Sequence, residues 1–198
     1  QKIAEPARIA ITGGSYGGYA TLVGLTFTPD VFTAGVDIVG PSNLSTLLAS
    51  IPPYWKPQIE IFATRVGDNR TEEGRKFLES RSPIGYVEKI SKPLLIAQGA
   101  NDPRVKQAES DQIVKAMQAK KIPVTYALFP DEGHGFARQE NNIAFFAVSE
   151  AFLAKHLGGR SEPIGDAFMG SSITVPQGTE LVPGLKESLP AAPVTSSH

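Results

Sequence analysis

Cysteine is absent from the sequence of 198 residues. Its absence excludes disulfides, thiolate-bound metals and a cysteine nucleophile. It also leaves the cellular compartment open, because a chain without cysteine suits reducing and oxidising surroundings alike.

An excess of one charge is absent too. Lysine and arginine number 19 against 20 aspartates and glutamates, so the formal net charge is -1. The chain therefore lacks the positive field typical of proteins that bind nucleic acid or anionic membranes. No run of about 18 apolar residues occurs, and no membrane span is predicted. We expect a soluble protein, either cytoplasmic or exported to a periplasm or beyond.

The length and the composition favour one packed domain, alone or with an appendage. Hydrophobic residues make up 41% of the chain and charged residues 20%, which is enough apolar material for a core. The first residue is Gln1 rather than Met, and no basic-then-apolar leader follows it. We therefore expect either a processed start or a piece of a longer chain.

Short apolar segments alternate with helical patterns over residues 1–158. The expected strands cover residues 8–11, 34–39, 93–98 and 124–129. The expected helices are one that ends near residue 27 and others over 42–50, 71–79, 107–121 and 141–157, with a proline-stiffened loop at 52–57. Strands that alternate with helices and read as continuous apolar runs pair in parallel, so the sequence predicts an α/β fold with helices on both faces of a mainly parallel sheet.

Residues 159–198 have a different character, with five prolines, six serines and only scattered apolar residues. We expect this stretch to be an irregular tail outside the core, extended or partly disordered. Residues 172–175 and 181–182 are its only candidates for short strands.

The segment Gly-Gly-Ser-Tyr-Gly at 13–17 matches the pattern G-x-S-x-G between a strand and a helix. In that setting the serine occupies a sharp, strained turn, and the backbone N–H of Tyr16 can face a developing oxyanion. The spacing excludes a dinucleotide-binding loop, because the second residue after Gly13 is Ser15. It excludes a phosphate loop, because Gly18 is followed by Tyr19 rather than lysine. The pattern predicts Ser15 as a nucleophile, with a plain tight turn as the alternative, and neither a cofactor nor a metal.

A serine nucleophile needs a base, and the chain has only three histidines. His198 is the last residue, and His156 lies in the last turn of an expected helix, where a surface role is typical. His134 follows the fourth expected strand, so it lies at the same edge of a parallel sheet as Ser15. His134 is therefore the predicted base.

The third member of such a site is an acid that orients the imidazole. Asp102 follows the third expected strand, whereas Asp131 and Glu132 are so close to His134 in sequence that either would need a strained loop. The order Ser15, Asp102, His134, each just after a different strand, is that of the α/β-hydrolase triad.

Three segments together resemble the prolyl oligopeptidase family of serine peptidases, which includes dipeptidyl and acylaminoacyl peptidases. They are Gly-Gly-Ser-Tyr-Gly-Gly-Tyr at 13–19, Gln-Gly-Ala-Asn-Asp-Pro-Arg-Val at 98–105 and Asp-Glu-Gly-His-Gly-Phe at 131–136. The similarity covers about residues 6–158. It implies hydrolysis of short peptides through an acyl-enzyme, on a partial α/β-hydrolase fold.

The resemblance also implies roles around the triad. The residue after the nucleophile, here Tyr16, gives a backbone oxyanion donor. Arg104 and Val105 correspond to residues that line the substrate cleft. Tyr54 and Trp55 fall where the family has aromatic walls of the pocket for the P1 side chain, the residue before the cleaved bond.

Several family features would precede Gln1: the first half of the sheet, a loop with a tyrosine as second oxyanion donor, and an N-terminal β-propeller. We expect these parts of the same protein to be partners of this chain. Two alternatives stay open at this point: a carboxylesterase or lipase with the same fold, and an inactive fragment without the second oxyanion donor.

Overall fold

Four apolar segments form the parallel part of a sheet in the computed structural model, which describes residues 3–51 and 53–189. The five strands are β1 (Ala10–Gly14), β2 (Ala34–Ile38), β3 (Leu94–Gly99), β4 (Thr125–Phe129) and β5 (Thr174–Gln177). They lie side by side in chain order. The first four pair in parallel, and β5 joins β4 antiparallel. The predicted mainly parallel sheet is confirmed.

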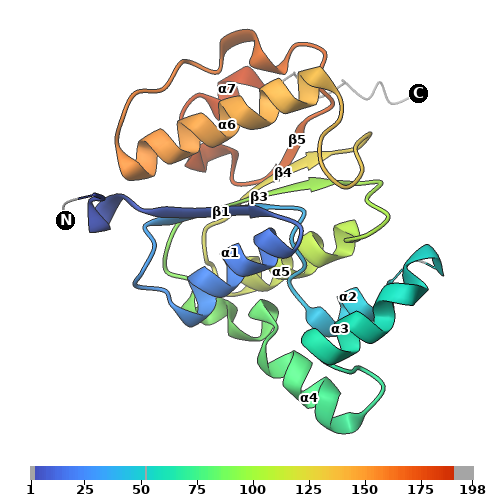
Figure 1. Cartoon of the computed structure of the whole chain (residues 1–198). Coiled ribbons are helices and arrows are strands. Elements are labelled where there is room, and N and C mark those ends of the chain that lie inside the picture. The colour runs from blue at the N-terminus through green and yellow to red at the C-terminus, as the bar shows by residue number, and fades with distance from the viewer. Residues whose placement is uncertain (1–2, 52, 190–198) are drawn as a thin grey trace.

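Helices cover both faces of this sheet (Figure 1). On one face, α1 (Tyr16–Phe27) and α5 (Gln107–Ala119) pack on Leu94 and Ile96 of β3. On the other face, α6 (Gln139–Leu157) packs on Leu95 and Ala97 of the same strand. Alternate residues of β3 thus serve opposite cores, which explains why the strand reads as a continuous apolar run. Among the described residues, no helix is both long and apolar enough to cross a membrane.

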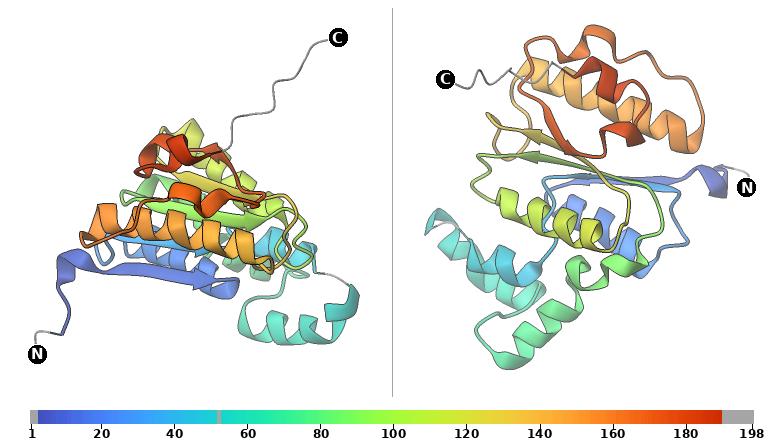
Figure 2. Two further views of the ribbon diagram at one scale, coloured as in Figure 1. Left: turned by 90° about the horizontal axis from the view of Figure 1, so that it is seen from above. Right: turned by 180° about the vertical axis from the view of Figure 1, so that it is seen from behind.

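Between β2 and β3 the chain makes a group of short helices. The group consists of α2 (Leu44–Ala49), a 3-10 helix η2 (Pro53–Gln58), α3 (Ile59–Arg65), α4 (Glu72–Ser80) and a second 3-10 stretch η3 (Pro83–Lys89). Of these, α2 and α3 project beyond the carboxyl ends of the strands (Figure 2). Helix α4 begins as expected, because the Thr71 side chain accepts a hydrogen bond from the Gly74 N–H. The expected loop at 52–57 is instead helical from residue 53, because proline is compatible with a first helical turn.

The segment after Gly159 corrects an expectation. In its described part, Ile164, Phe168, Ile173, Val182 and Leu185 are buried in the core that α6 forms with the sheet. In addition to β5, this segment forms the 3-10 helices η4 (Gly165–Phe168) and η5 (Thr179–Leu181) and the short helix α7 (Leu185–Ser188). The prediction of a tail outside the core is wrong up to residue 189, because single apolar residues spaced between glycines and prolines are buried in this core. Residues 190–198, with His198, lie outside the described part.

Candidate active site

Ser15 lies at the turn between β1 and α1 with unusual backbone angles, φ 59° and ψ −121°. A positive φ in a residue other than glycine stores about 1–3 kcal/mol of strain and persists only where neighbours enforce it. The Ser15 N–H donates to the Ile38 carbonyl at 2.9 Å, and the Ser15 carbonyl accepts from the N–H of Gly18 at 2.9 Å. These bonds hold the side chain of Ser15 out of the helix at the carboxyl edge of the sheet.

Two glycines make this turn possible by close approach rather than by their own φ. A Cβ at Gly13 would come within 3.0 Å of the Gly17 carbonyl, and one at Gly18 would come equally close to the Asp37 carboxyl group. At Gly17 a Cβ would meet nothing within 4 Å. The requirement for small residues therefore holds at Gly13 and Gly18 and not at Gly17.

His134 lies in the loop between β4 and α6, and its two ring nitrogens face the other two predicted residues. Nε2 lies 2.9 Å from the Ser15 hydroxyl oxygen, and Nδ1 lies 2.7 Å from Asp102 Oδ2. The His134 side chain is 14% exposed and that of Asp102 is 0% exposed. The structure thus brings the three predicted residues into one hydrogen-bonded chain whose acid end is fully buried.

The second oxygen of Asp102 is occupied as well. Oδ1 accepts hydrogen bonds from the backbone N–H groups of Arg104, at 2.8 Å, and Val105, at 2.9 Å. The carboxylate is therefore fixed by its own loop, and its free oxygen is directed at the imidazole. A buried acid in this position holds the imidazole in one tautomer and orientation.

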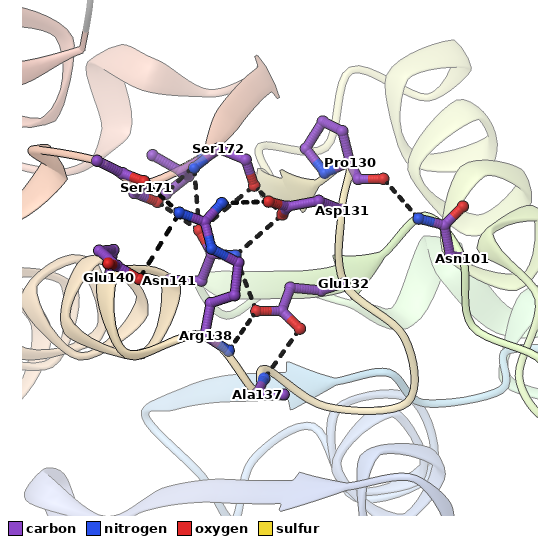
Figure 3. A network of polar contacts seen from close by, with 12 residues as sticks. Asn101, Pro130, Asp131, Glu132, Ala137, Arg138, Glu140, Asn141, Ser171 and Ser172 are labelled. Atoms are coloured by element: carbon purple, nitrogen blue, oxygen red, sulfur yellow. Dashed lines mark hydrogen bonds and ion pairs between the residues drawn. The ribbon is translucent and has the colours of Figure 1, made fainter.

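The competing acids and histidines lie elsewhere. Asp131 pairs with the guanidinium of Arg138, and the Glu132 carboxylate accepts from backbone N–H groups, so neither bonds to His134 (Figure 3). His156 packs edge-on against Phe152 with ring centroids 4.7 Å apart. Burial, with a smaller contribution from the charge of Lys155, lowers the pKa of His156.

A cavity of about 410 Å³ opens beside Ser15. Its apolar lining residues are Tyr16, Pro41, Leu47, Ile51, Trp55, Ile61, Phe62, Val66 and Val105. Trp55 stacks on Phe62 with ring centroids 6.1 Å apart, and the guanidinium of Arg104 lies 5.5 Å from the Trp55 ring centroid. Arg65 also lines the cavity. The hollow can accommodate an apolar side chain next to the serine hydroxyl.

Most of the predicted cleft residues line this cavity, and one does not. Trp55, Arg104 and Val105 do so, but Tyr54 is 60% exposed and lies outside it. In the 3-10 helix η2, neighbouring residues point in different directions, so only one of the two aromatics can face the hollow. The contribution of α3 was missed, although the spacing of Ile61, Phe62, Arg65 and Val66 marks one helical face.

One acid beneath the turn has no counterpart in the sequence-based site. Asp37, on β2, is 1% exposed, and no described group makes a well-aligned hydrogen bond to either of its carboxyl oxygens. Burial raises its pKa to about 7, and the nearby N–H of Gly40 offsets only part of that rise. Asp37 is thus poised to change protonation state near neutral pH.

The sequence of this chain is similar to sequences of known proteins. A sequence model of the prolyl oligopeptidase family matches residues 1–160. The chain is 68% identical, over 96% of its length, to dipeptidyl aminopeptidase BIII of Pseudoxanthomonas mexicana, and 51% identical, over 87%, to dipeptidyl peptidase family member 6 of Caenorhabditis elegans. It covers 27% and 24% of these two proteins, so it spans about a quarter of the length of the curated relatives.

A solved structure shows the same fold. The puromycin-hydrolysing peptidase of Mycobacterium tuberculosis superposes with a TM-score of 0.72 at 33% identity, over 81% of this chain and 23% of that protein. An acylaminoacyl peptidase bound to a chloromethyl ketone superposes with a TM-score of 0.69 at 25% identity, over 82% of this chain and 26% of that protein.

Proposed function

The chain belongs to the prolyl oligopeptidase family of serine peptidases, and from that premise we propose that it carries the catalytic triad of an enzyme that hydrolyses short peptides. Ser15 is the nucleophile, His134 the general base and then acid, and Asp102 the residue that orients the imidazole. The observation that carries this proposal is the hydrogen-bonded chain from Ser15 Oγ through His134 to Asp102, at 2.9 and 2.7 Å.

The proposed reaction proceeds through an acyl-enzyme. Ser15 Oγ attacks the carbonyl carbon of the scissile bond while its proton passes to His134 Nε2. The N–H of Tyr16 faces the resulting oxyanion, since Tyr16 is the first residue of α1 and its N–H has no partner within the helix. His134 then protonates the leaving amine, which departs. Water then attacks the acyl carbon while its proton passes to His134 Nε2, and His134 returns that proton to Ser15 Oγ as the bond to the acyl group breaks and the acid product leaves.

The cavity beside Ser15 supports a substrate with an apolar P1 side chain. Trp55 and Val105 form part of its apolar wall, and the guanidinium of Arg104 at its rim is suited to bind a peptide carbonyl of the substrate. The related proteins are named for releasing dipeptides or acylated amino acids. We therefore infer a substrate with a short segment on the acyl side of the cleaved bond.

The relatives are about four times as long as this chain, and we propose that the full enzyme includes a corresponding further part. Among the described residues, β1 pairs only with β2, so its other edge is free. Next to it, an open hollow of about 550 Å³ lies between Thr12 of β1 and Phe146 and Leu153 of α6. Phe146 is 65% exposed there. An unpaired edge with adjoining apolar surface suits further strands of the same protein, and we propose that these strands, a second oxyanion donor and a β-propeller complete the site.

The proposal is tested with the full-length protein and a fluorophosphonate probe. We expect covalent labelling of Ser15 and its complete loss in Ser15→Ala, with hydrolysis of a peptide amide lost in parallel. Labelling that persists in Ser15→Ala would overturn the nucleophile assignment. Absence of labelling in folded wild-type protein would mean that the triad is not catalytic. A protein that turns over short acyl esters but no peptide amide would be an esterase rather than a peptidase.

A further inference from the structure

The loop that carries His134 has little regular structure of its own. This histidine loop, residues 130–138, connects β4 to α6. Within it, the N–H of Gly135 donates to the Gly133 carbonyl at 3.0 Å, and Gly135 has a φ of 105°. A loop with two glycines around its functional residue has many accessible conformations. Some other interaction must therefore fix the imidazole within hydrogen-bonding distance of Ser15.

The carboxylate of Glu132 provides that interaction (Figure 3). The residue is 3% exposed, and both of its carboxylate oxygens accept hydrogen bonds. Oε2 accepts from the N–H of Ala137 at 2.9 Å, and Oε1 accepts from the N–H of Arg138 at 2.9 Å and from Asn141 Nδ2 at 2.8 Å. The side chain therefore closes the loop from two residues before His134 to three and four residues after it.

The backbone of Glu132 ties the same loop to the loop of Asp102. The Glu132 carbonyl accepts from the N–H of Asn101 at 2.8 Å, and the Asn101 side chain donates to the Pro130 carbonyl at 2.8 Å. The two loops touch so closely that a Cβ at Gly99 would lie within 3.0 Å of the Gly133 carbonyl. The loops that carry His134 and Asp102 are thus fastened directly to each other.

The segment at 170–172 forms hydrogen bonds to the histidine loop and to Asn141 from the outer side. Asn141 Oδ1 accepts from the Ser171 hydroxyl at 2.9 Å and from the N–H of Ser172 at 3.0 Å. The guanidinium of Arg138 donates to the Gly170 carbonyl at 2.8 Å, and Asp131 bonds to both Arg138 and the Ser172 hydroxyl. These partners lie after residue 160, where the match to the family model ends.

We propose that Glu132 is a positioning residue for the general base, and that residues 170–172 secure it through Asn141. The proposal rests on the proposed function of His134. Glu132 does not touch the reacting atoms; it acts through the conformation of the histidine loop. Its loss should therefore lower the rate of the chemical step and leave substrate binding in the separate apolar cavity intact.

The test is Glu132→Gln in the full-length protein. Glutamine keeps the size of the side chain, but its NH₂ group must face a backbone N–H where an oxygen now accepts. We expect kcat to fall at least tenfold with KM within twofold of wild type. We also expect backbone amides of residues 131–138 to exchange hydrogen faster while those of β1 to β4 stay protected. Glu140→Gln is the matched control, because Glu140 is exposed and pairs only with Arg138, at 3.6 Å, among the described residues; it should match wild type.

Asn141→Asp gives a second, independent variant. It replaces the amide that donates to Glu132 with a second carboxylate, and we expect the same pattern of kcat loss and loop exchange. Unchanged kcat and unchanged loop exchange in Glu132→Gln would overturn the proposal, as would a rate loss accompanied by faster exchange throughout the sheet. If wild-type protein fails to react with the fluorophosphonate probe, the proposed function is wrong, and the exchange comparison alone still decides whether Glu132 fastens the loop.

Discussion

The buried acid Asp37 makes the stability of the protein depend on pH in an unusual direction. Its side chain lies under the turn of Ser15, so close to Gly18 and Gly40 that a Cβ at either glycine would meet Oδ1 within 3.0 Å. The residue is 1% exposed, and burial raises its pKa from 3.8 to about 7. The folded protein therefore binds this proton far more tightly than the unfolded chain.

The sign and the size follow from proton linkage. Between pH 3.8 and about 7 the folded state holds more protons than the unfolded state, so the free energy of unfolding decreases as the pH rises through this window. At about 1.36 kcal/mol per pH unit, the difference between the two pKa values corresponds to roughly 4 kcal/mol lost between pH 4 and pH 8. That is a large fraction of the 5–15 kcal/mol typical of a folded domain.

The perturbation is Asp37→Asn, which keeps the shape and removes the titration. We expect the variant to gain stability relative to wild type as the pH rises from 5 to 8, measured as the shift of the urea unfolding midpoint at several pH values. Comparing the two proteins at each pH cancels the titration of all other groups. If the unfolding midpoints of the two proteins change in parallel from pH 5 to pH 8, the buried-acid argument is refuted. If the variant instead becomes less stable relative to wild type toward pH 8, the effect has the opposite sign to the one expected.

Two further predictions concern the turn and the cavity. Gly13→Ala should prevent assembly of the Ser15 turn and abolish fluorophosphonate labelling, because its Cβ would overlap the Gly17 carbonyl. Gly17→Ala should label as wild type does, because its Cβ meets open space. Equal labelling of the two variants would contradict this prediction. Trp55→Ala should raise KM about tenfold for substrates with a bulky apolar P1 side chain, because Trp55 lines the cavity. Tyr54→Ala should change KM less than twofold, because Tyr54 is exposed and lies outside the cavity. Equal effects of the two substitutions on KM would show that Tyr54 also contacts the substrate.

The proximity of Ser15, Asp102 and His134 could be predicted from the sequence because a parallel sheet converts chain order into position. Each residue follows a strand, and in a parallel sheet the carboxyl ends of all strands lie at one edge. The register of β1, β2 and β3 sets Gly14 beside Ile38 and Ile38 beside Ala97, just before the turns that carry Ser15 and Asp102. A local pattern was therefore enough to predict a contact across 119 residues.

The walls of the cavity and the C-terminal segment could not be predicted in the same way. Whether Tyr54 or Trp55 faces the hollow depends on the rotation of one short 3-10 helix, which no sequence period specifies. Apart from the candidate strands at 172–175 and 181–182, the apolar residues after Gly159 show no strand or helix period, so their burial depends on the edge of β4 and the surface of α6 being available. In both cases tertiary packing decides what the local sequence leaves undetermined.

The sequence alone also does not decide whether Glu132 or Asp102 bonds to the imidazole of His134. By position alone Glu132 competes with Asp102 for the imidazole, since both are acids close to His134 in sequence or in space. The decision depends on backbone donors: two N–H groups of the histidine loop capture the Glu132 carboxylate, and two N–H groups of the other loop capture Asp102 Oδ1 and leave Oδ2 free. An acid whose oxygens are both occupied by backbone can hold a loop but cannot orient a base. The distinction between the acid we propose for the triad and the acid we propose to support it therefore lies in which oxygen the backbone leaves unoccupied.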